Sequence, residues 1–466
     1  MKKLLPKKYR RLIWAGLLVC LILYVLGSLL APPLAGTQRK SDRQIKLPVP
    51  AAERVCLVDG NEEALLWRLR LIRSAQSEIV LSTFDFRVDE SGSDVVAALL
   101  DAAERGVQVR LLVDGMNAQL HLQGSAAFQA LAAHENAEVR FYNPLRLTRL
   151  WTVNYRCHDK YLIIDRGAYL MGGRNTSDLF LGSGGATRQN MDRDVVVHGG
   201  GSGRGSAAAL LDYFEDIWAL DTNREFRANG EKGTVQRAAA ALRERWAAIN
   251  GAGRLTPIDW DAETIPADGV TVLHGDCAAR NKEPVLLNTL TALMQGGRER
   301  IVVQTPYIIC NRAMYDALQK AATGAAQVQI ITNAPQSGAN PWGCADYLNQ
   351  KKTILSTGAS VCEWHGERSM HTKTILIDGR FSIIGSFNWD IRSAYLDTEL
   401  MLLVDCPELN AALRAEADEM VRQGRLLLPD GTAVEGAAYT APEMPLYKKL
   451  LQPVLRVVIR PFRYVL

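Results

Sequence analysis

The stretch His371-Thr372-Lys373, followed by Asp378 and then by Gly385-Ser386-Phe387-Asn388, decides how this chain is organised. Apolar residues fill the intervals, and Asp378-Gly379 is typical of a hairpin turn, so two short buried strands are predicted. Because side chains alternate along a strand, His371 and Lys373 should project from the same face. An imidazole and an ammonium in one small volume suit a phosphate, since Lys neutralises charge while His attacks phosphorus or moves a proton.

The same pattern occurs once more, in the first half of the chain. His158-Asp159-Lys160 leads to Asp165 and then to Gly172-Gly173-Arg174-Asn175. In both copies Lys lies two residues after His, Asp five after Lys, Gly seven after Asp, and Asn three after Gly. A single His-x-Lys is common, but a pattern repeated at identical spacing indicates an internal duplication.

Each copy follows a predicted strand, helix and strand. These segments are residues 79–84, 94–105 and 107–113 in the first half, and residues 300–305, 313–322 and 328–331 in the second. The repeated order predicts an α/β fold made of two duplicated halves that pack face to face, with a transmembrane helix before them.

We expect five segments along the chain: a basic end with a membrane anchor, a first half, a linker with a helix, a second half, and a basic amphipathic tail. Their predicted bounds are residues 1–46, 47–225, 226–265, 266–440 and 441–466. The glycine-serine stretch 199–205 is predicted to be a flexible connection. Two interpretations of the tail remain open, a helix on a lipid surface or a helix docked on the body.

A near-unbroken apolar run, residues 12–31, is long enough to cross about 30 Å of hydrocarbon. Lys and Arg side chains precede it, which predicts a cytoplasmic N-terminus and a catalytic body on the extracytoplasmic face of the cell membrane. Basic residues also follow the run, so the charge pattern supports the predicted orientation less strongly than the apolar run supports a membrane span. A cleaved signal peptide is the alternative, and the length of the run and the poor cleavage site at Pro33-Leu34-Ala35 disfavour it.

The formal net charge of +4 conceals an uneven distribution. Residues 1–46 carry +9 and residues 444–466 carry +5, which leaves −10 for residues 47–443. An acidic body lacks the basic footprint of a duplex nucleic-acid binder, whereas basic ends favour an anionic membrane as the partner. The eight cysteines contain no Cys-x-x-Cys, so the sequence predicts no zinc or redox site, and no cofactor is expected.

The two motifs resemble those of the phospholipase D superfamily. Residues 384–393, with Glu399 six residues on, are similar to the version in bacterial cardiolipin synthases, and the resemblance covers about residues 50–425. Cys157, next to the first His, departs from the family pattern. The resemblance implies an acidic partner for each imidazole, and Asp194 and Glu399, each at the start of a predicted strand, are expected to fix a tautomer and raise the pKa of the His.

Two His and two Lys supply a nucleophile, a proton and charge neutralisation without a metal. We expect His158 to attack phosphorus, giving a phosphohistidine, and His371 to protonate the leaving alcohol, with the reverse assignment left open. The expected phosphate contacts are Lys160, Lys373, Asn175 and Asn388.

Four further residues of the motifs are weaker candidates. Asp165 and Asp378 are counted with the catalytic residues, although their place beside a turn favours a structural role. Gly173 and Ser386 are candidate substrate contacts, with a structural role as the alternative.

The predicted function is a membrane-anchored transphosphatidylase that transfers a phosphatidyl group onto phosphatidylglycerol and so makes cardiolipin. The alternatives are a phospholipase D that releases phosphatidate, a nucleic-acid phosphodiesterase disfavoured by the acidic body, and a non-catalytic scaffold disfavoured by two intact His-Lys pairs. The sequence leaves open the donor lipid, the acceptor alcohol, the oligomeric state and the pairing of the cysteines.

Overall fold

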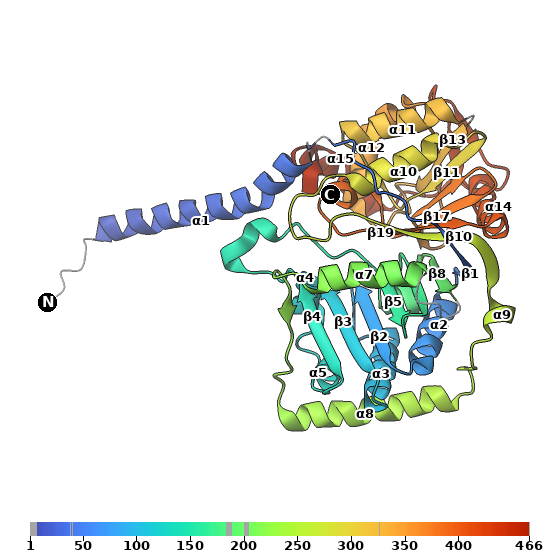
Figure 1. Cartoon of the computed structure of the whole chain (residues 1–466). Coiled ribbons are helices and arrows are strands. Elements are labelled where there is room, and N and C mark those ends of the chain that lie inside the picture. Colours follow the sequence, from blue (N-terminus) through green and yellow to red (C-terminus); the bar gives the residue numbers. More distant parts are fainter. Residues whose placement is uncertain are drawn as a thin grey trace.

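The structure, a computed structural model, describes residues 7–37, 39, 41–182, 189–199, 205–325 and 327–465. It confirms the predicted fold class, since two α/β halves lie one above the other and helix α1 (Lys7–Gly36) projects from one side of them (Figure 1). Most of the predicted flexible connection, residues 200–204, lies outside the described residues.

The two halves have the same sheet, in which three parallel strands are followed by an antiparallel hairpin and a last strand. In the first half these strands are β2 (Glu78–Thr83), β3 (Gln108–Asp114), β4 (Ala137–Tyr142), β5 (Tyr161–Ile164), β6 (Ala168–Gly172) and β8 (Asp194–His198). In the second half they are β11 (Arg300–Gln304), β13 (Gln327–Asn333), β14 (Ser360–Trp364), β16 (Thr374–Ile377), β17 (Phe381–Gly385) and β19 (Leu400–Asp405).

Two long strands join the halves into one continuous sheet. Strand β1 (Ala51–Val58) pairs with β8 on one side and with β10 (Ile265–His274) on the other, and β10 pairs in turn with β19. Backbone hydrogen bonds therefore join the sheets of the two halves into one sheet, and this pairing fixes the relative orientation of the halves.

Helices cover both faces of the sheets. The outer helices are α2 (Asn61–Ser74), α3 (Glu90–Glu104) and α5 (Ala126–Ala132) in the first half, and α10 (Val285–Gln295), α11 (Arg312–Gly324) and α12 (Pro341–Leu355) in the second. Between the halves lie α7 (Ser206–Trp218) and α14 (Pro407–Gln423), whose apolar residues share one core with strands of both halves. In α7, Leu210, Phe214 and Ile217 follow at helical spacing and are all fully buried.

Helix α1 (Lys7–Gly36) is the one helix within the described ranges that is long and apolar enough to cross a membrane by length and composition. Its first part projects from the body and is exposed, and its last part packs against the body, with Ser28 and Pro33 buried. The Tyr24 hydroxyl donates to the carbonyl oxygen of Leu147 (2.8 Å) at the point where the helix meets the body.

The predicted linker contains helix α8 (Lys232–Gly251), which packs on α3 and α5 through Leu242 and Trp246. The predicted tail contains helix α15 (Leu446–Val458), which continues through Pro453, and the 3₁₀ helix η2 (Arg460–Val465).

One arginine ties the first half to the second. Arg193 is 1% exposed, and its guanidinium donates to Asp59 Oδ1 (2.7 Å), Gln304 Oε1 (2.9 Å) and Thr374 Oγ1 (3.0 Å) and also pairs with Glu416. Gln304, Thr374 and Glu416 belong to the second half. Removing the guanidinium would take away the ion-pair partner of two carboxylates, Asp59 and Glu416, and the hydrogen-bond donor of the buried Gln304 amide.

Arg193→Ala should therefore lower the free energy of unfolding by roughly 3–5 kcal/mol, the usual cost of breaking one side of a buried ion pair. Denaturant unfolding of the full chain in detergent measures this. The matched control is Arg380→Ala, which removes an exposed bidentate pair with Asp405 and should change stability little. Equal effects of the two substitutions would contradict this role of Arg193.

Candidate active site

The two His-x-Lys segments precede β5 and β16 and meet at the boundary between the halves. Each is bonded there to the opposite half. The His371 N–H donates to the carbonyl of Met191 (2.7 Å), next to the short parallel pairing of β7 (Asn190–Met191) with β15 (Ser369–Met370). The His158 N–H donates to Thr398 Oγ1 (3.1 Å), beside an isolated bridge between Cys157 and Thr398. At this bridge the Thr398 N–H donates to the carbonyl oxygen of Arg156 (2.9 Å), while the N–H of Cys157, which departs from the family pattern, donates to Asp114 Oδ2 (3.1 Å) within its own half.

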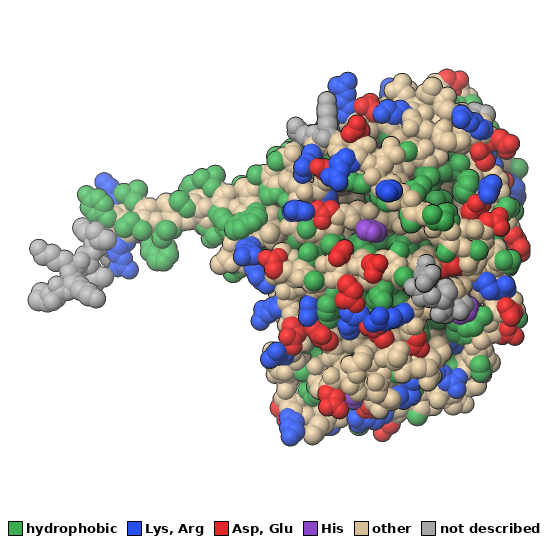
Figure 2. Space-filling view, viewed as in Figure 1, with side chains coloured by type: hydrophobic (Ala, Val, Ile, Leu, Met, Phe, Trp, Pro, Cys, Tyr) green, Lys and Arg blue, Asp and Glu red, His purple; other side chains and the backbone are tan. Residues whose placement is uncertain are grey.

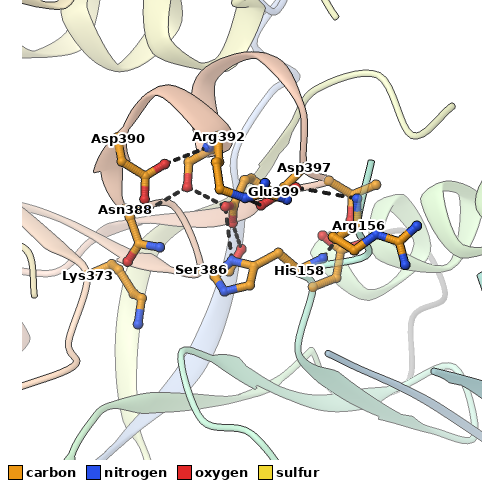
Figure 3. Close-up of polar contacts among 12 residues, drawn as sticks. Arg156, His158, Lys373, Ser386, Asn388, Asp390, Arg392, Asp397 and Glu399 are labelled. Carbon is orange, nitrogen blue, oxygen red and sulfur yellow. Dashed lines mark hydrogen bonds and ion pairs between the residues drawn. The ribbon is translucent and has the colours of Figure 1, made fainter. Parts of the chain in front are cut away.

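Each imidazole is bound by a carboxylate from the other half. His158 Nδ1 lies 3.0 Å from Glu399 Oε1, and His371 Nδ1 lies 2.6 Å from Asp192 Oδ2. Figure 3 shows His158 turned toward Glu399, with Ser386 beside them. Because Nδ1 is engaged in both rings, Nε2 is the nitrogen left for chemistry, and this reciprocal exchange brings both imidazoles to one interface.

The expectation that Asp194 partners an imidazole is wrong. Strand pairing sets Gly172 opposite Asp194 and Gly385 opposite Met401, so the residue equivalent to Glu399 is Asp192, two positions earlier. Asp192 and Asp194 are two residues apart, so their side chains lie on the same face of an extended segment. The sequence pattern alone does not distinguish them, and the prediction chose the wrong one.

Asp194 instead has a structural role inside the first half. Its Oδ2 pairs with Arg68 (3.0 Å) and Arg174 (3.3 Å), and all three side chains are buried. Gly173 lies against the Asp192 carboxylate, and a Cβ at this position would collide with it. Gly173, predicted to contact substrate, thus has a different role: because it has no side chain, the Asp192 carboxylate can pack against its backbone.

The two lysines lie beside the imidazoles and are buried. Lys160 Nζ donates to the carbonyl oxygen of His158, and Lys373 Nζ donates to that of His371. Lys373 Nζ also lies 2.6 Å from Nδ1 and 3.2 Å from Nε2 of His371. Two aromatic rings, which the sequence reasoning missed, stand edge-on to the imidazoles, Phe84 to His158 (5.1 Å between ring centres) and Phe180 to His371 (4.9 Å). These rings wall the site with apolar surface.

The serine of the second motif acts on the carboxylate. The hydroxyls of Ser386 and Ser393 both donate to Glu399, and Ser386 also accepts from the N–H of Leu400. Ser386 therefore orients the acid that binds His158, in place of the expected substrate contact. Asn175 Oδ1 accepts from the N–H of Asp85 (3.3 Å).

In the second half Asn388 Nδ2 donates to the Tyr307 hydroxyl (3.3 Å). The Asn388 side-chain oxygen is buried and has no partner among the described residues. A buried acceptor or donor left unpaired at this position is compatible with a contact made only when substrate is present.

Asp165 and Asp378 lie at the far ends of β5 and β16, away from the His and Lys that precede these strands. Both adopt left-handed backbone angles (φ 48° and 50°) in the hairpin turns. The Asp165 carboxylate accepts three backbone N–H groups of residues 76–78, and that of Asp378 accepts three of residues 298–300. Their inclusion among the catalytic residues is corrected, because each holds a turn against the start of a neighbouring strand.

The pKa values of the ionisable groups around the second motif depart strongly from their ordinary values. Burial and the adjacent Lys373 lower the pKa of His371 to about 4, although Asp192 opposes them. Burial also lowers the pKa of Lys373 to about 8. Burial alone would raise the pKa of Asp192, but Lys373 and His371 outweigh it and lower it to about 2. The expectation that the carboxylates raise the pKa of the imidazoles is thus wrong in net effect, since desolvation and the ammonium groups dominate.

The pKa of the imidazole in the first motif is lowered as well. Burial and Lys160 lower the pKa of His158, while burial raises that of Glu399 to about 8 against the opposing effects of Lys160 and the two serines. No cluster of three or more His, Cys, Asp or Glu in the described part of the chain could hold a metal ion.

Comparisons with known proteins identify the family. The family model described as cardiolipin synthase, phospholipase D-like domain, matches residues 69–218 and 290–421, which is more than half of the chain. Cardiolipin synthase C of Escherichia coli is 26% identical over 392 residues, covering 74% of this chain and 80% of that protein. Cardiolipin synthase 1 of Bacillus cereus is 25% identical over 364 residues, covering 76% and 64%.

A solved structure shares the fold. The crystal structure of phosphatidylserine synthase from Haemophilus influenzae superposes with a TM-score of 0.63 at 16% identity, over 90% of this chain and 98% of that one. The family match lies on both halves and contains both His-x-Lys motifs. This chain therefore belongs to the phospholipase D superfamily, as an enzyme of its cardiolipin synthase-like branch.

Proposed function

We propose that this protein is a membrane-anchored transphosphatidylase, which transfers a phosphatidyl group through a phosphohistidine and makes cardiolipin when phosphatidylglycerol is the acceptor. The observation that carries the proposal is the reciprocal pairing of His158 with Glu399 and of His371 with Asp192. It supports one shared site with two imidazoles and two ammonium groups. The curated relatives named cardiolipin synthase support the choice of substrate class.

In the first step, Nε2 of His158 attacks the lipid phosphorus. A phosphorus–nitrogen bond forms as the phosphorus–oxygen bond to the leaving alcohol breaks, and His371 donates a proton to the departing oxygen. Lys160 and Lys373 neutralise the charge that builds up on the non-bridging oxygens. Their positions within the buried site make this stabilisation stronger than it would be in water.

In the second step, the proton balance reverses. His371, now neutral, takes the proton of the incoming alcohol, whose oxygen attacks phosphorus and releases Nε2 of His158. The pseudo-symmetry of the halves equally supports attack by His371 with His158 as the acid. Phe84 and Phe180 limit the access of water to the intermediate, which favours a lipid alcohol over hydrolysis.

Binding of the anionic substrate changes the protonation state of His371, the residue that acts as proton donor in the first step. In the free protein, burial and Lys373 keep His371 neutral at pH 7. A negatively charged phosphate beside the ring would offset Lys373 and raise the pKa of the imidazole, so that the proton donor is formed when substrate is present.

The first test is the product. We expect purified full-length protein in mixed vesicles to make cardiolipin when phosphatidylglycerol is supplied, and His158→Ala and His371→Ala to abolish it. Thin-layer chromatography or lipid mass spectrometry measures both. Phosphatidate as the sole product would favour the hydrolase. Cleavage of DNA without turnover of lipid would favour the nucleic-acid enzyme.

The second test separates the two kinds of motif aspartate. Asp192→Asn should lower turnover by roughly 10²–10⁴-fold, because the imidazole loses the carboxylate that orients it. Asp165→Asn makes the same chemical change in a turn and should leave turnover close to that of the wild type while weakening thermal stability. Similar turnover of the two variants would argue against a role for Asp192.

The third test uses pH. The pKa of His371 is lowered from 6.5 to about 4 in the folded state, so the unfolded chain binds this proton first as pH falls. Unfolding free energy should therefore drop between pH 6.5 and 4, with at most about 3 kcal/mol from this group. His371→Gln should remove that part of the slope in denaturant titrations, and the exposed control His121→Gln should keep it. An unchanged slope in His371→Gln would refute the shift.

A further inference from the structure

Helix α15 carries an apolar face that no described part of the chain covers. Leu446, Leu450, Val454 and Val457 recur at helical spacing and are 72%, 67%, 57% and 67% exposed. Side chains at this spacing form one stripe, and a stripe of this kind on a soluble surface indicates an interaction site.

The opposite side of α15 is held on the second half. Lys448 Nζ donates to the carbonyl oxygens of Gln336 (2.7 Å) and Gly338 (3.0 Å), just before α12. Arg456 donates to the Asn349 side chain (3.0 Å) within α12. These contacts combine the two interpretations of the tail, since one side is docked on the body while the apolar stripe faces outward.

Helix α15 lies near the end of α1 that meets the body. Figure 1 shows α15 and the C-terminus next to that end, and η2 contacts α1 directly. A second exposed apolar segment, η1 (Leu147–Thr152), contacts α1 as well. Its Leu147 and Trp151 are 77% and 46% exposed.

The depth of these contacts along α1 is informative. The apolar run of α1 ends at Ala31, seven residues beyond Tyr24, whose hydroxyl bonds Leu147. At 1.5 Å per residue, the contact lies roughly 10 Å inside the outer end of the run. Amphipathic elements at a membrane surface bury their apolar faces by about 5–10 Å, and Trp is enriched at that level. If α1 spans the bilayer, η1 is at the depth of the interface.

Positive charge accompanies the apolar side chains. Lys449, Arg456 and Arg460 are exposed on α15 and η2, and no acidic residue occurs from residue 444 onward. Figure 2 shows hydrophobic side chains along the whole projecting helix, with Lys and Arg side chains where it joins the body. This arrangement suits a leaflet with anionic headgroups.

We propose that η1 and the apolar face of α15 form an interfacial surface, defined as Leu147, Trp151, Leu446, Leu450, Val454 and Val457, which embeds in an anionic leaflet beside α1. The proposal rests on the membrane anchoring assigned to α1 under the proposed function. It goes beyond that function because it gives the catalytic body a fixed seat on the bilayer instead of a flexible tether.

The seat is connected to the active site by hydrogen bonds. Arg392 donates to the carbonyl oxygens of Val465 at the end of the tail (3.1 Å) and of Asn154 beside η1 (2.9 Å), and it pairs with Asp397 (2.8 Å). Asn154 in turn donates to the carbonyl oxygen of Leu29 in α1 (2.8 Å). Asp397 precedes Thr398 and Glu399, which bind His158, so hydrogen bonds link the segments next to the interfacial surface to the active site.

A depth measurement tests the surface without relying on activity. A nitroxide is attached at Leu450→Cys or Val457→Cys in full-length Cys20→Ser protein, reconstituted in vesicles of phosphatidylcholine and phosphatidylglycerol. We expect dissolved oxygen to relax the label strongly and a water-soluble nickel chelate to relax it weakly. Val434→Cys, on the exposed strand β21 (Ala433–Glu435), should show the reverse. The Cys20→Ser protein alone supplies the background.

Strong relaxation by the nickel chelate at both α15 positions would overturn the proposal. Dipolar broadening between labels, lost on dilution with unlabelled protein, would also overturn it, because a second copy would then cover the face.

Turnover gives an independent readout. Leu450→Glu combined with Val457→Glu should reduce turnover of phosphatidylglycerol in vesicles severalfold and leave turnover of monomeric short-chain phosphatidylglycerol unchanged, and Val434→Glu should change neither. Unchanged vesicle turnover in the double variant would contradict the surface. If the wild type turns over neither lipid, the proposed function fails while the depth measurement still decides the surface.

Discussion

The reciprocal binding of each imidazole by a carboxylate of the opposite half is the constraint on which the site depends. Neither half could assemble a complete unit by itself, since His158 needs Glu399 and His371 needs Asp192. The continuous sheet through β1 and β10, the core around α7 and α14, and the buried Arg193 hold the halves in the position that these contacts require. Fold stability and active-site geometry are thus set by the same interface.

Burial explains both the electrostatics and the chemistry. Both lysines, His158 and both carboxylates are buried, and His371 is only partly exposed. This is tolerated because each of these groups has a hydrogen-bond partner, a carboxylate for each imidazole and a backbone carbonyl for each ammonium. The same desolvation lowers the pKa of both imidazoles and of Lys373, and keeps the resting histidines neutral. The site is therefore arranged for an anionic substrate, whose phosphate would restore the missing negative charge.

The sequence predicted the duplicated α/β fold and the His-Lys positions because their spacing is repeated and strand alternation is local. It missed Asp192, because Asp192 and Asp194 lie two residues apart where β8 begins and share the same alternation. Only the pairing of Gly172 with Asp194 distinguishes them. The exchange of acids between halves, and the rings of Phe84 and Phe180, depend on contacts between distant segments. The local spacing of residues along the sequence carries no information about such contacts. The tail illustrates the same limit, because its pattern gave an amphipathic helix but not its place beside α1.

The most direct measurement is the location of the covalent intermediate. Protein mixed with phospholipid is quenched in alkali, where a phosphorus–nitrogen bond survives, and its peptides are mapped by mass spectrometry. The account predicts a phosphatidyl group on the peptide that contains His158, lost when lipid acceptor is added. Continued turnover with no adduct on the imidazole of either residue 158 or residue 371 would contradict it.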